Sequence, residues 1–149
     1  MKTVLVTTDL SKESKKAFVT AAELARAFNA KIVILSVVED PSQAAMFYAM
    51  DFPVLPEPGI RAQVINKLTA DLKSLQNEHF AAFPTECVVR EANGSIYQEI
   101  LRCADSINAD FIVLATHGRT GIKHLLIGST AERVARESRH PVVIVPAKE

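Results

Sequence analysis

The chain has 149 residues, of which 48% are hydrophobic and 23% charged, and its formal net charge at pH 7 is zero. This length suits one domain over residues 1–149, which can bury enough surface to fold without a disulfide or a structural metal. A neutral balance of charge argues against a general nucleic-acid binder, whose affinity depends on an excess of lysine and arginine. The sequence also has no apolar run long enough to span a membrane and no signal-peptide pattern, so we expect a soluble cytoplasmic protein.

Two cysteines occur in the sequence, Cys87 and Cys103. Their spacing matches neither a CxxC pair nor a zinc site. We therefore expect both thiols to be reduced and to fill apolar space.

The first part of the chain is predicted to form a strand, a helix and a second strand. The β-branched run "TVLVT", Thr3–Thr7, is typical of a buried strand. Apolar residues then recur at helical spacing from Lys12 to Asn29, with Ser11 as the expected N-cap and Asn29 as the expected stop. The run "KIVILSVV", Lys31–Val38, is the second predicted strand.

The segment Glu39–Gly59 breaks this pattern. It contains four of the seven prolines and several large apolar residues without regular spacing. A connection of this length within a compact domain is often functional. Two interpretations stay open: an irregular insertion with a short helix around Ser42–Met50, or a lid.

The remainder of the chain alternates helices with strands. Helical spacing runs from Ile60 towards Phe80, and a second helix is expected to begin at Ser95 after a turn at Gly94. A last helix is expected from about Ser129 to Ser138. Three more apolar runs are predicted strands: "ECVVRE", Glu86–Glu91; "DFIVLA", Asp110–Ala115; and "PVVIVP", Pro141–Pro146.

The order of these elements predicts the fold class. Strands without apolar–polar alternation, separated by amphipathic helices, indicate an α/β protein with a parallel sheet. We therefore expect a single-domain, open, five-stranded parallel sheet with helices on both faces, of the Rossmann-like kind.

Three of the five glycines fall between the fourth predicted strand and the last helix, within "LATHGRTGIKHLLIGST", Leu114–Thr130. Ligands of open α/β sheets bind beyond the carboxyl ends of the strands. A helix that starts at Gly128 offers free N–H groups and the positive end of its dipole, which favour a phosphate. Gly128 would let the phosphate approach the backbone, so we expect a Gly128→Val variant to lose the ligand and keep the fold.

Polar side chains around these glycines support the same hypothesis. Ser129 and Thr130 add hydroxyl groups that can contact phosphate or a phosphate-bound Mg²⁺. Arg119 and Lys123 lie in the intervening segment and can reach the outer phosphates. A structural interpretation fits the same residues equally well, with the glycines as turn formers and the start of the helix as an ordinary cap. Neither a Walker A loop nor a GxGxxG fingerprint occurs.

Asp9 is a second candidate, because it follows the first predicted strand at the same edge of the sheet. Its carboxylate can accept a hydrogen bond from a base amine or a ribose hydroxyl. The alternative, compatible with the first, is that Asp9 helps Ser11 to cap the following helix.

These residues together resemble the universal stress protein family. The opening "VLVTTDLSKESKKAF" is similar to the family's first strand, aspartate and helix, and "VILSVVED" to its second strand. The C-terminal segment "DFIVLATHGRTGIKHLLIGSTAERVARESRHPVVIVP" is similar to the family's C-terminal signature throughout. The family's nucleotide-binding branch carries glycine, two residues, glycine, nine residues, glycine and then serine or threonine. Here Gly118, Gly128 and Ser129 match, whereas Ala115 replaces the first glycine.

The resemblance implies strand order 3-2-1-4-5 and ATP as ligand, with Mg²⁺ held through the phosphates near Ser129. Adenine would lie near Asp9 and Val37, and ribose near Ala115. The full set of residues implied to contact ATP is Thr7, Asp9, Val37, Ala115, Gly118, Arg119, Gly128, Ser129 and Thr130. It also implies a homodimer through the last strand, residues Val142, Val143, Ile144 and Val145.

Three functions compete at this stage. The first is a small regulatory module of the stress response that binds ATP, with hydrolysis slow or absent. The second is a hydrolase or nucleotidyl transferase, which no GxSxG elbow and no evident general base support. His117 and His124 are the nearby histidines and are more typical of turn residues. The third is a dimeric interaction protein that binds no nucleotide, which the alanine at position 115 favours.

Overall fold

The computed structural model describes residues 1–39, 59–118 and 127–147. Within them, five strands alternate with helices along the chain, as the sequence predicts. The strands are β1 (Thr3–Thr7), β2 (Lys31–Val38), β3 (Thr85–Glu91), β4 (Phe111–Ala115) and β5 (Val142–Val145). The helices are the 3₁₀ turn η1 (Ser14–Lys16), α1 (Ala17–Phe28), α3 (Gly59–His79), α4 (Ile96–Ser106) and α5 (Ser129–Glu137). The predicted short helix around Ser42–Met50 and the lid interpretation lie outside the described residues.

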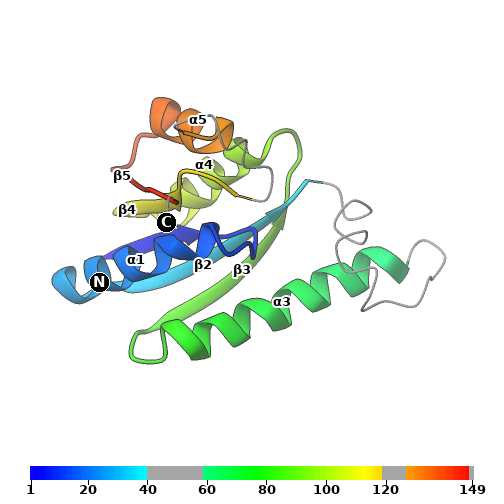
Figure 1. The fold of residues 1–149 in the computed structure, drawn as a ribbon, viewed down its shortest axis with the longest axis horizontal. Helices are drawn as coiled ribbons and strands as arrows, with labels where there is room; N and C mark the ends of the chain where they lie inside the picture. Colours follow the sequence, from blue (N-terminus) through cyan, green and yellow to red (C-terminus); the bar gives the residue numbers. More distant parts are fainter. Residues whose placement is uncertain (40–58, 119–126, 148–149) are drawn as a thin grey trace.

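All five strands are parallel and form one sheet in the order β3-β2-β1-β4-β5 (Figure 1). This order confirms the expected Rossmann-like topology. It places β1 at the centre, between β2 and β4, and leaves β5 at one edge. The chain crosses from one half of the sheet to the other between β3 and β4, so the order reverses beside β1.

Helices cover both faces of the sheet, with α1 and α3 on one face and α4 and α5 on the other (Figure 1). Alternate strand residues point to opposite faces because the side-chain period of a strand is two. Val4, Val6 and Val113 therefore pack with Phe18 of α1 and the C-terminal half of α3. Leu5, Val33, Leu35, Ile112 and Leu114 pack with α4 and α5 instead. Both faces are buried, which explains why the strand sequences show no apolar–polar alternation.

The start of the first helix differs from the prediction. The α-helix begins at Ala17 rather than Lys12, and η1 precedes it. The Ser11 hydroxyl accepts the backbone N–H of Ser14 at 3.1 Å, and the Ser14 hydroxyl contacts Ser11 O at 3.0 Å. These local bonds hold a tighter turn, because serine side chains compete with the helical ladder.

The predicted stop at Asn29 is confirmed, as is the predicted turn at Gly94. Asn29 has φ 51° and ψ 50°, and its N–H bonds Ala25 O. Asparagine is one of the few residues that tolerate this left-handed conformation. Gly94 has φ 114°, a value that a side chain disfavours, and helix α4 begins two residues later.

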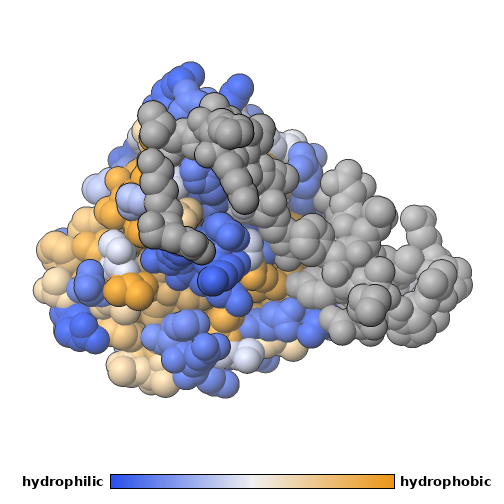
Figure 2. All heavy atoms as spheres, in the orientation of Figure 1, coloured by the Kyte–Doolittle hydropathy of each residue, from blue (hydrophilic) through white to orange (hydrophobic). Residues whose placement is uncertain are grey.

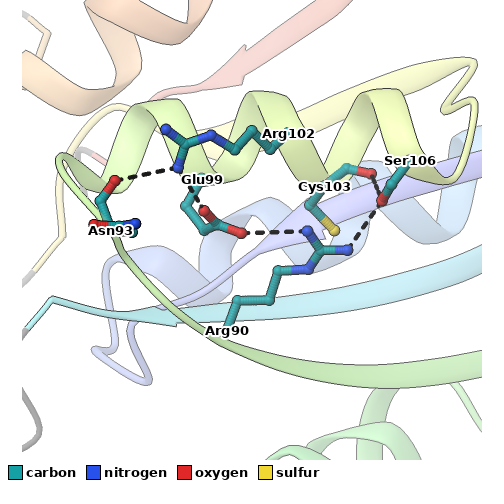
Figure 3. Close-up of polar contacts among 6 residues, drawn as sticks. All are labelled: Arg90, Asn93, Glu99, Arg102, Cys103 and Ser106. Atoms are coloured by element: carbon teal, nitrogen blue, oxygen red, sulfur yellow. Dashed lines mark hydrogen bonds and ion pairs between the residues drawn. The ribbon is translucent and has the colours of Figure 1, made fainter.

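An ion-pair cluster around the buried Glu99 joins α4 to β3 (Figure 3). Glu99 of α4 is 8% exposed and pairs with Arg90 of β3 at 3.2 Å and with Arg102 at 2.9 Å. Arg90 also donates to the Ser106 hydroxyl at 2.9 Å, and Arg102 donates to Asn93 O at 3.3 Å. Burial raises the pKa of Glu99, but the hydrogen bonds from Arg102 and Arg90 outweigh it, so the pKa of the carboxyl is lowered overall.

Candidate functional site

The candidate site lies where β1 and β4 end, at the centre of the sheet. The two strands are neighbours, with Val6 opposite Val113 in the register. Their carboxyl ends therefore meet at one edge, and the segments that follow them face each other. This is the switch point at which open α/β sheets bind ligands.

The turn after β1 is fixed by its own side chains. Thr8 is 5% exposed; its N–H bonds Leu35 O at 2.9 Å and its hydroxyl contacts that of Ser14 at 2.8 Å. The same hydroxyl accepts the N–H of Leu10 at 3.0 Å. Leu10 itself has φ 67°, an unusual conformation for a large side chain. A buried threonine and a constrained leucine thus hold Asp9 between them.

The contacts of the Asp9 carboxylate include a local one and a long-range one. Its Oδ1 accepts the N–H of Ser11 at 3.0 Å, as the capping interpretation expects. Its other oxygen lies against Gly118, where a Cβ would overlap Oδ2 and would lie 3.1 Å from Cγ. The structure therefore brings together two of the sequence-predicted site residues, and Gly118 is needed to let the carboxylate approach.

Gly128 is also explained by a close approach, but to the protein's own backbone. Its N–H bonds Thr116 O at 2.7 Å, and a Cβ at position 128 would lie 2.7 Å from that same oxygen. That Gly128→Val keeps its fold stays a prediction, and this contact adds that valine would have to move the backbone to fit there. Its φ of −69° is ordinary, so space rather than conformation requires glycine.

The same contact positions the amino end of α5 beside the end of β4. Gly128 is the N-cap of α5 and gives the helix no side-chain cap. The amides of the first turn, on Ser129, Thr130 and Ala131, consequently receive no acceptor from the cap residue. Ser129 is exposed and Thr130 is half-buried.

The remaining predicted residues take different positions. Thr7 ends β1 and is half-buried, opposite Leu35 of β2. Val37 lies on β2, the other neighbour of β1, and packs partly against the α4 and α5 face. Arg119 lies outside the described residues, together with Gly121, Lys123 and His124.

Ala115, which stands where the family pattern has glycine, is buried. It is 8% exposed and belongs to the apolar cluster beneath α1 and α3. Its Cβ therefore points into the core of that face. The methyl group contributes to packing there, which weakens the argument that it crowds a ligand at the edge.

Three residues of the site were missed by sequence reasoning: Thr8, Leu10 and Thr116. The available signal was a threonine directly after each of the two strands, Thr8 and Thr116, where a buried hydroxyl can satisfy turn amides. Backbone strain at Leu10 left no sequence signal, because leucine is not a residue that predicts positive φ.

Other chemistry is not evident in the part of the chain that the structure describes. There, no group of three or more histidine, cysteine, aspartate or glutamate side chains has metal-binding geometry, and no helix could cross a membrane.

Cys87 and Cys103 are free thiols, half-buried and buried, and burial raises the pKa of both. This favours the predicted packing role over a reactive one.

Comparison with known proteins decides the family. The family model of the universal stress protein family matches residues 1–146. The chain belongs to that family. One curated member, universal stress protein MJ0531 of Methanocaldococcus jannaschii, is 30% identical over 158 aligned positions that cover 99% of this chain and 85% of the relative.

Solved structures of family members share the fold. The structure of MJ0577, a universal stress protein of M. jannaschii, superposes with a TM-score of 0.77 at 22% identity and covers 99% of this chain and 97% of its own. A universal stress protein solved in complex with cAMP superposes with a TM-score of 0.65 at 28% identity and covers 99% and 98%. Some family members of this fold therefore bind nucleotides.

Proposed function

We propose that this universal stress protein binds ATP, with Mg²⁺ held through the phosphates, at the carboxyl edge between β1 and β4. It would act as a small nucleotide-responsive module of the stress response rather than as an efficient enzyme. The observation that carries the proposal is the placement of the amino end of α5, whose N-cap Gly128 has no side chain, beside the Asp9–Gly118 contact.

The amino end of α5 is suited to a polyanion. Its first-turn amides and the positive end of the helix dipole both favour negative charge, and glycine at the N-cap supplies no competing acceptor. The exposed Ser129 hydroxyl adds a donor to phosphate oxygens. Because the described residues show no cluster of metal ligands, Mg²⁺ would be held mainly by the phosphates themselves.

Asp9 is suited to the nucleoside part of the ligand. A carboxylate accepts hydrogen bonds only, which favours a base amine or a ribose hydroxyl and disfavours phosphate. Asp9 follows β1, whereas the start of α5 lies beside the end of β4. The proposed site therefore has a hydrogen-bond acceptor for the nucleoside in one part and an anion-binding helix end in another. The cAMP complex of a 28% identical relative supports a purine nucleotide as the ligand class.

The edge strand β5 supports a homodimer as the assembled form. The described strands leave the outer side of β5 unpaired, and its half-buried residues are Val142, Val143, Ile144 and Val145. Apolar surface also gathers around the C-terminal end of α1 and the nearby ends of β4 and β5 (Figure 2), where Phe28 is 43% exposed. An open apolar edge is an aggregation hazard unless a second strand pairs with it.

A dimer that binds no nucleotide is the second candidate, and the alanine at position 115 is the observation that favours it. The buried position of the Ala115 side chain reduces the weight of that observation. Replacing Ala115 by the family's glycine tests directly whether the methyl group hinders nucleotide binding. If ribose is crowded, Ala115→Gly will raise ATP affinity; if the methyl group only packs in the core, it will lower stability and leave affinity unchanged.

Isothermal titration calorimetry of the purified chain with ATP and MgCl₂ tests the proposed function. We expect saturable binding of ATP to the full chain, and weaker binding by Ser129→Ala and by Asp9→Ala. Asp9→Ala should also lose preference for ATP over GTP. Mass spectrometry of heat-released small molecules provides an independent reading. No binding of ATP, GTP or cAMP by the wild-type chain would leave the dimeric interaction protein as the function.

A further inference from the structure

We propose that Thr116 is a positioning residue that couples the C-terminal segment after β5 to the amino end of α5. The ligand side of this inference rests on the proposed nucleotide site, whereas the coupling itself rests on contacts within the chain. Thr116 is 8% exposed and follows the last residue of β4. The hydrogen bonds of Thr116 go to β5, to the start of α5, to His117 and to Ala147, so it would act on the site through these groups.

The polar groups of Thr116 bond β5 with the residues directly after it, the start of α5 and the neighbouring His117. Its N–H bonds Val145 O of β5 at 2.9 Å, and its carbonyl accepts the N–H of Gly128 at 2.7 Å. Its hydroxyl accepts the N–H of Ala147 at 2.9 Å and contacts Nδ1 of His117 at 3.0 Å. One buried residue therefore connects the end of β4, the start of α5 and the residues that follow β5.

The C-terminal segment is fastened at a second point. The carbonyl of Ala147 accepts a hydrogen bond from Nζ of Lys16 at 2.8 Å, and its side chain packs against the cluster beneath α1 and α3. Lys16 belongs to η1, which follows the turn that carries Asp9. The segment after β5 thus bridges the two sides of the candidate site.

This arrangement predicts a thermodynamic link between the ligand and the C-terminal segment. The hydroxyl of Thr116 fixes the backbone whose carbonyl fixes Gly128, so loss of the hydroxyl should loosen the start of α5. A ligand that holds the start of α5 should in turn stabilise the bond from Ala147 to Thr116. Such coupling is reciprocal, because each event changes the free energy of the other by the same amount.

Hydrogen exchange followed by NMR tests the link, with Thr116→Val as the variant and Thr116→Ser as the rescue. Valine has nearly the same shape but lacks the hydroxyl, whereas serine keeps it. Without nucleotide, we expect Thr116→Val to speed exchange of the Ala147 and Gly128 amides by about tenfold or more relative to wild type. Thr116→Ser should stay close to wild type. Thr69→Val is the matched control, because Thr69 bonds Ile65 O at 2.7 Å on α3, away from this edge.

Titration with ATP and MgCl₂ tests the ligand side. We expect Thr116→Val to weaken ATP binding about five- to tenfold, with Thr116→Ser and Thr69→Val near wild type. In the wild-type chain, ATP should slow exchange at the Ala147 amide, a measurement that needs no variant.

The outcomes separate the two proposals. If ATP binds but Thr116→Val binds it equally well and Gly128 exchange is unchanged, the coupling is wrong and the nucleotide site stands. If ATP does not bind the wild-type chain, the proposed function fails, and exchange at Gly128 alone decides whether Thr116 positions α5. Equal Gly128 exchange in wild type and Thr116→Val overturns the positioning role in either case.

Discussion

The carboxylate of Asp9 lies against the Cα of Gly118, although the two residues follow different strands. The contact exists because β1 and β4 are neighbours and both turns leave the sheet at the same edge. The Thr8 hydroxyl fixes the turn that carries Asp9 through its contacts with Ser14 and with the N–H of Leu10. The Asp9 carboxylate itself accepts the N–H of Ser11. Position 118 therefore decides where this carboxylate can lie.

Gly118→Ala should displace the Asp9 carboxylate, because the added Cβ would overlap Oδ2. We expect a loss of only about 0.5–1.5 kcal/mol in the free energy of unfolding, because the end of the Asp9 side chain can turn away at the cost of its bond to the N–H of Ser11, and weaker ATP binding. Urea denaturation checks the first expectation. Gly59→Ala is the control, since a Cβ there meets none of the described residues within 4 Å.

A double-mutant cycle with Asp9→Ala identifies the cause. Removing the carboxylate should relieve the clash, so the double variant should be more stable than the sum of the single effects by at least about 0.5 kcal/mol. Strict additivity would show that the two residues do not interact.

Gly128→Ala and Ser129→Ala should separate the structural from the ligand-binding part of the α5 start. A Cβ at position 128 would lie 2.7 Å from Thr116 O, so we expect Gly128→Ala to lose about 1–3 kcal/mol of stability together with ATP affinity. Ser129 is exposed, and its alanine variant should change stability by no more than about 0.5 kcal/mol. Its ATP affinity should still fall. Wild-type stability in Gly128→Ala would contradict the close approach seen in the structure.

The fold was largely predictable because its strands are apolar on both faces. The bounds of β1 and β2 match the prediction residue for residue, since β-branched runs ended by polar residues leave few alternatives. The strand order did not follow from periodicity, which carries no information about neighbours; it came with the family resemblance. The helix start was wrong because the bonds among Thr8, Ser11 and Ser14 depend on three-dimensional contacts.

The candidate site was predictable in outline but not in its physical reasons. Sequence position alone placed Asp9 and the glycines at one edge of the sheet. The sequence did not predict why each position needs glycine. A Cβ would meet the Asp9 carboxylate at position 118 and the Thr116 carbonyl at position 128. The threonine directly after β4 indicates a turn, but it does not predict the three backbone partners of Thr116, which are distant in sequence.

Glu99→Gln should destabilise the protein by about 1–3 kcal/mol, because it removes the charge that two arginines share at a largely buried position. The pH dependence has a definite sign. Since the pKa of Glu99 is lowered in the folded state, its contribution to stability is complete above the unfolded pKa and is lost as pH falls through the folded pKa. Denaturation between pH 7 and pH 3 should therefore show a smaller acid-dependent loss in Glu99→Gln. Glu132→Gln is the control, because its pair with Arg136 is exposed and should contribute little.

Alanine should have opposite effects at two asparagines. Asn29 closes α1 at φ 51°, where alanine meets steric strain, so Asn29→Ala should lose about 1 kcal/mol and Asn29→Gly should keep or raise stability. Asn77 is exposed inside α3, where alanine has the higher helix propensity, so Asn77→Ala should gain a few tenths of a kcal/mol. Urea midpoints at equal m-values measure both changes. If Asn29→Ala were as stable as wild type, the left-handed end of α1 would not be the conformation adopted in solution.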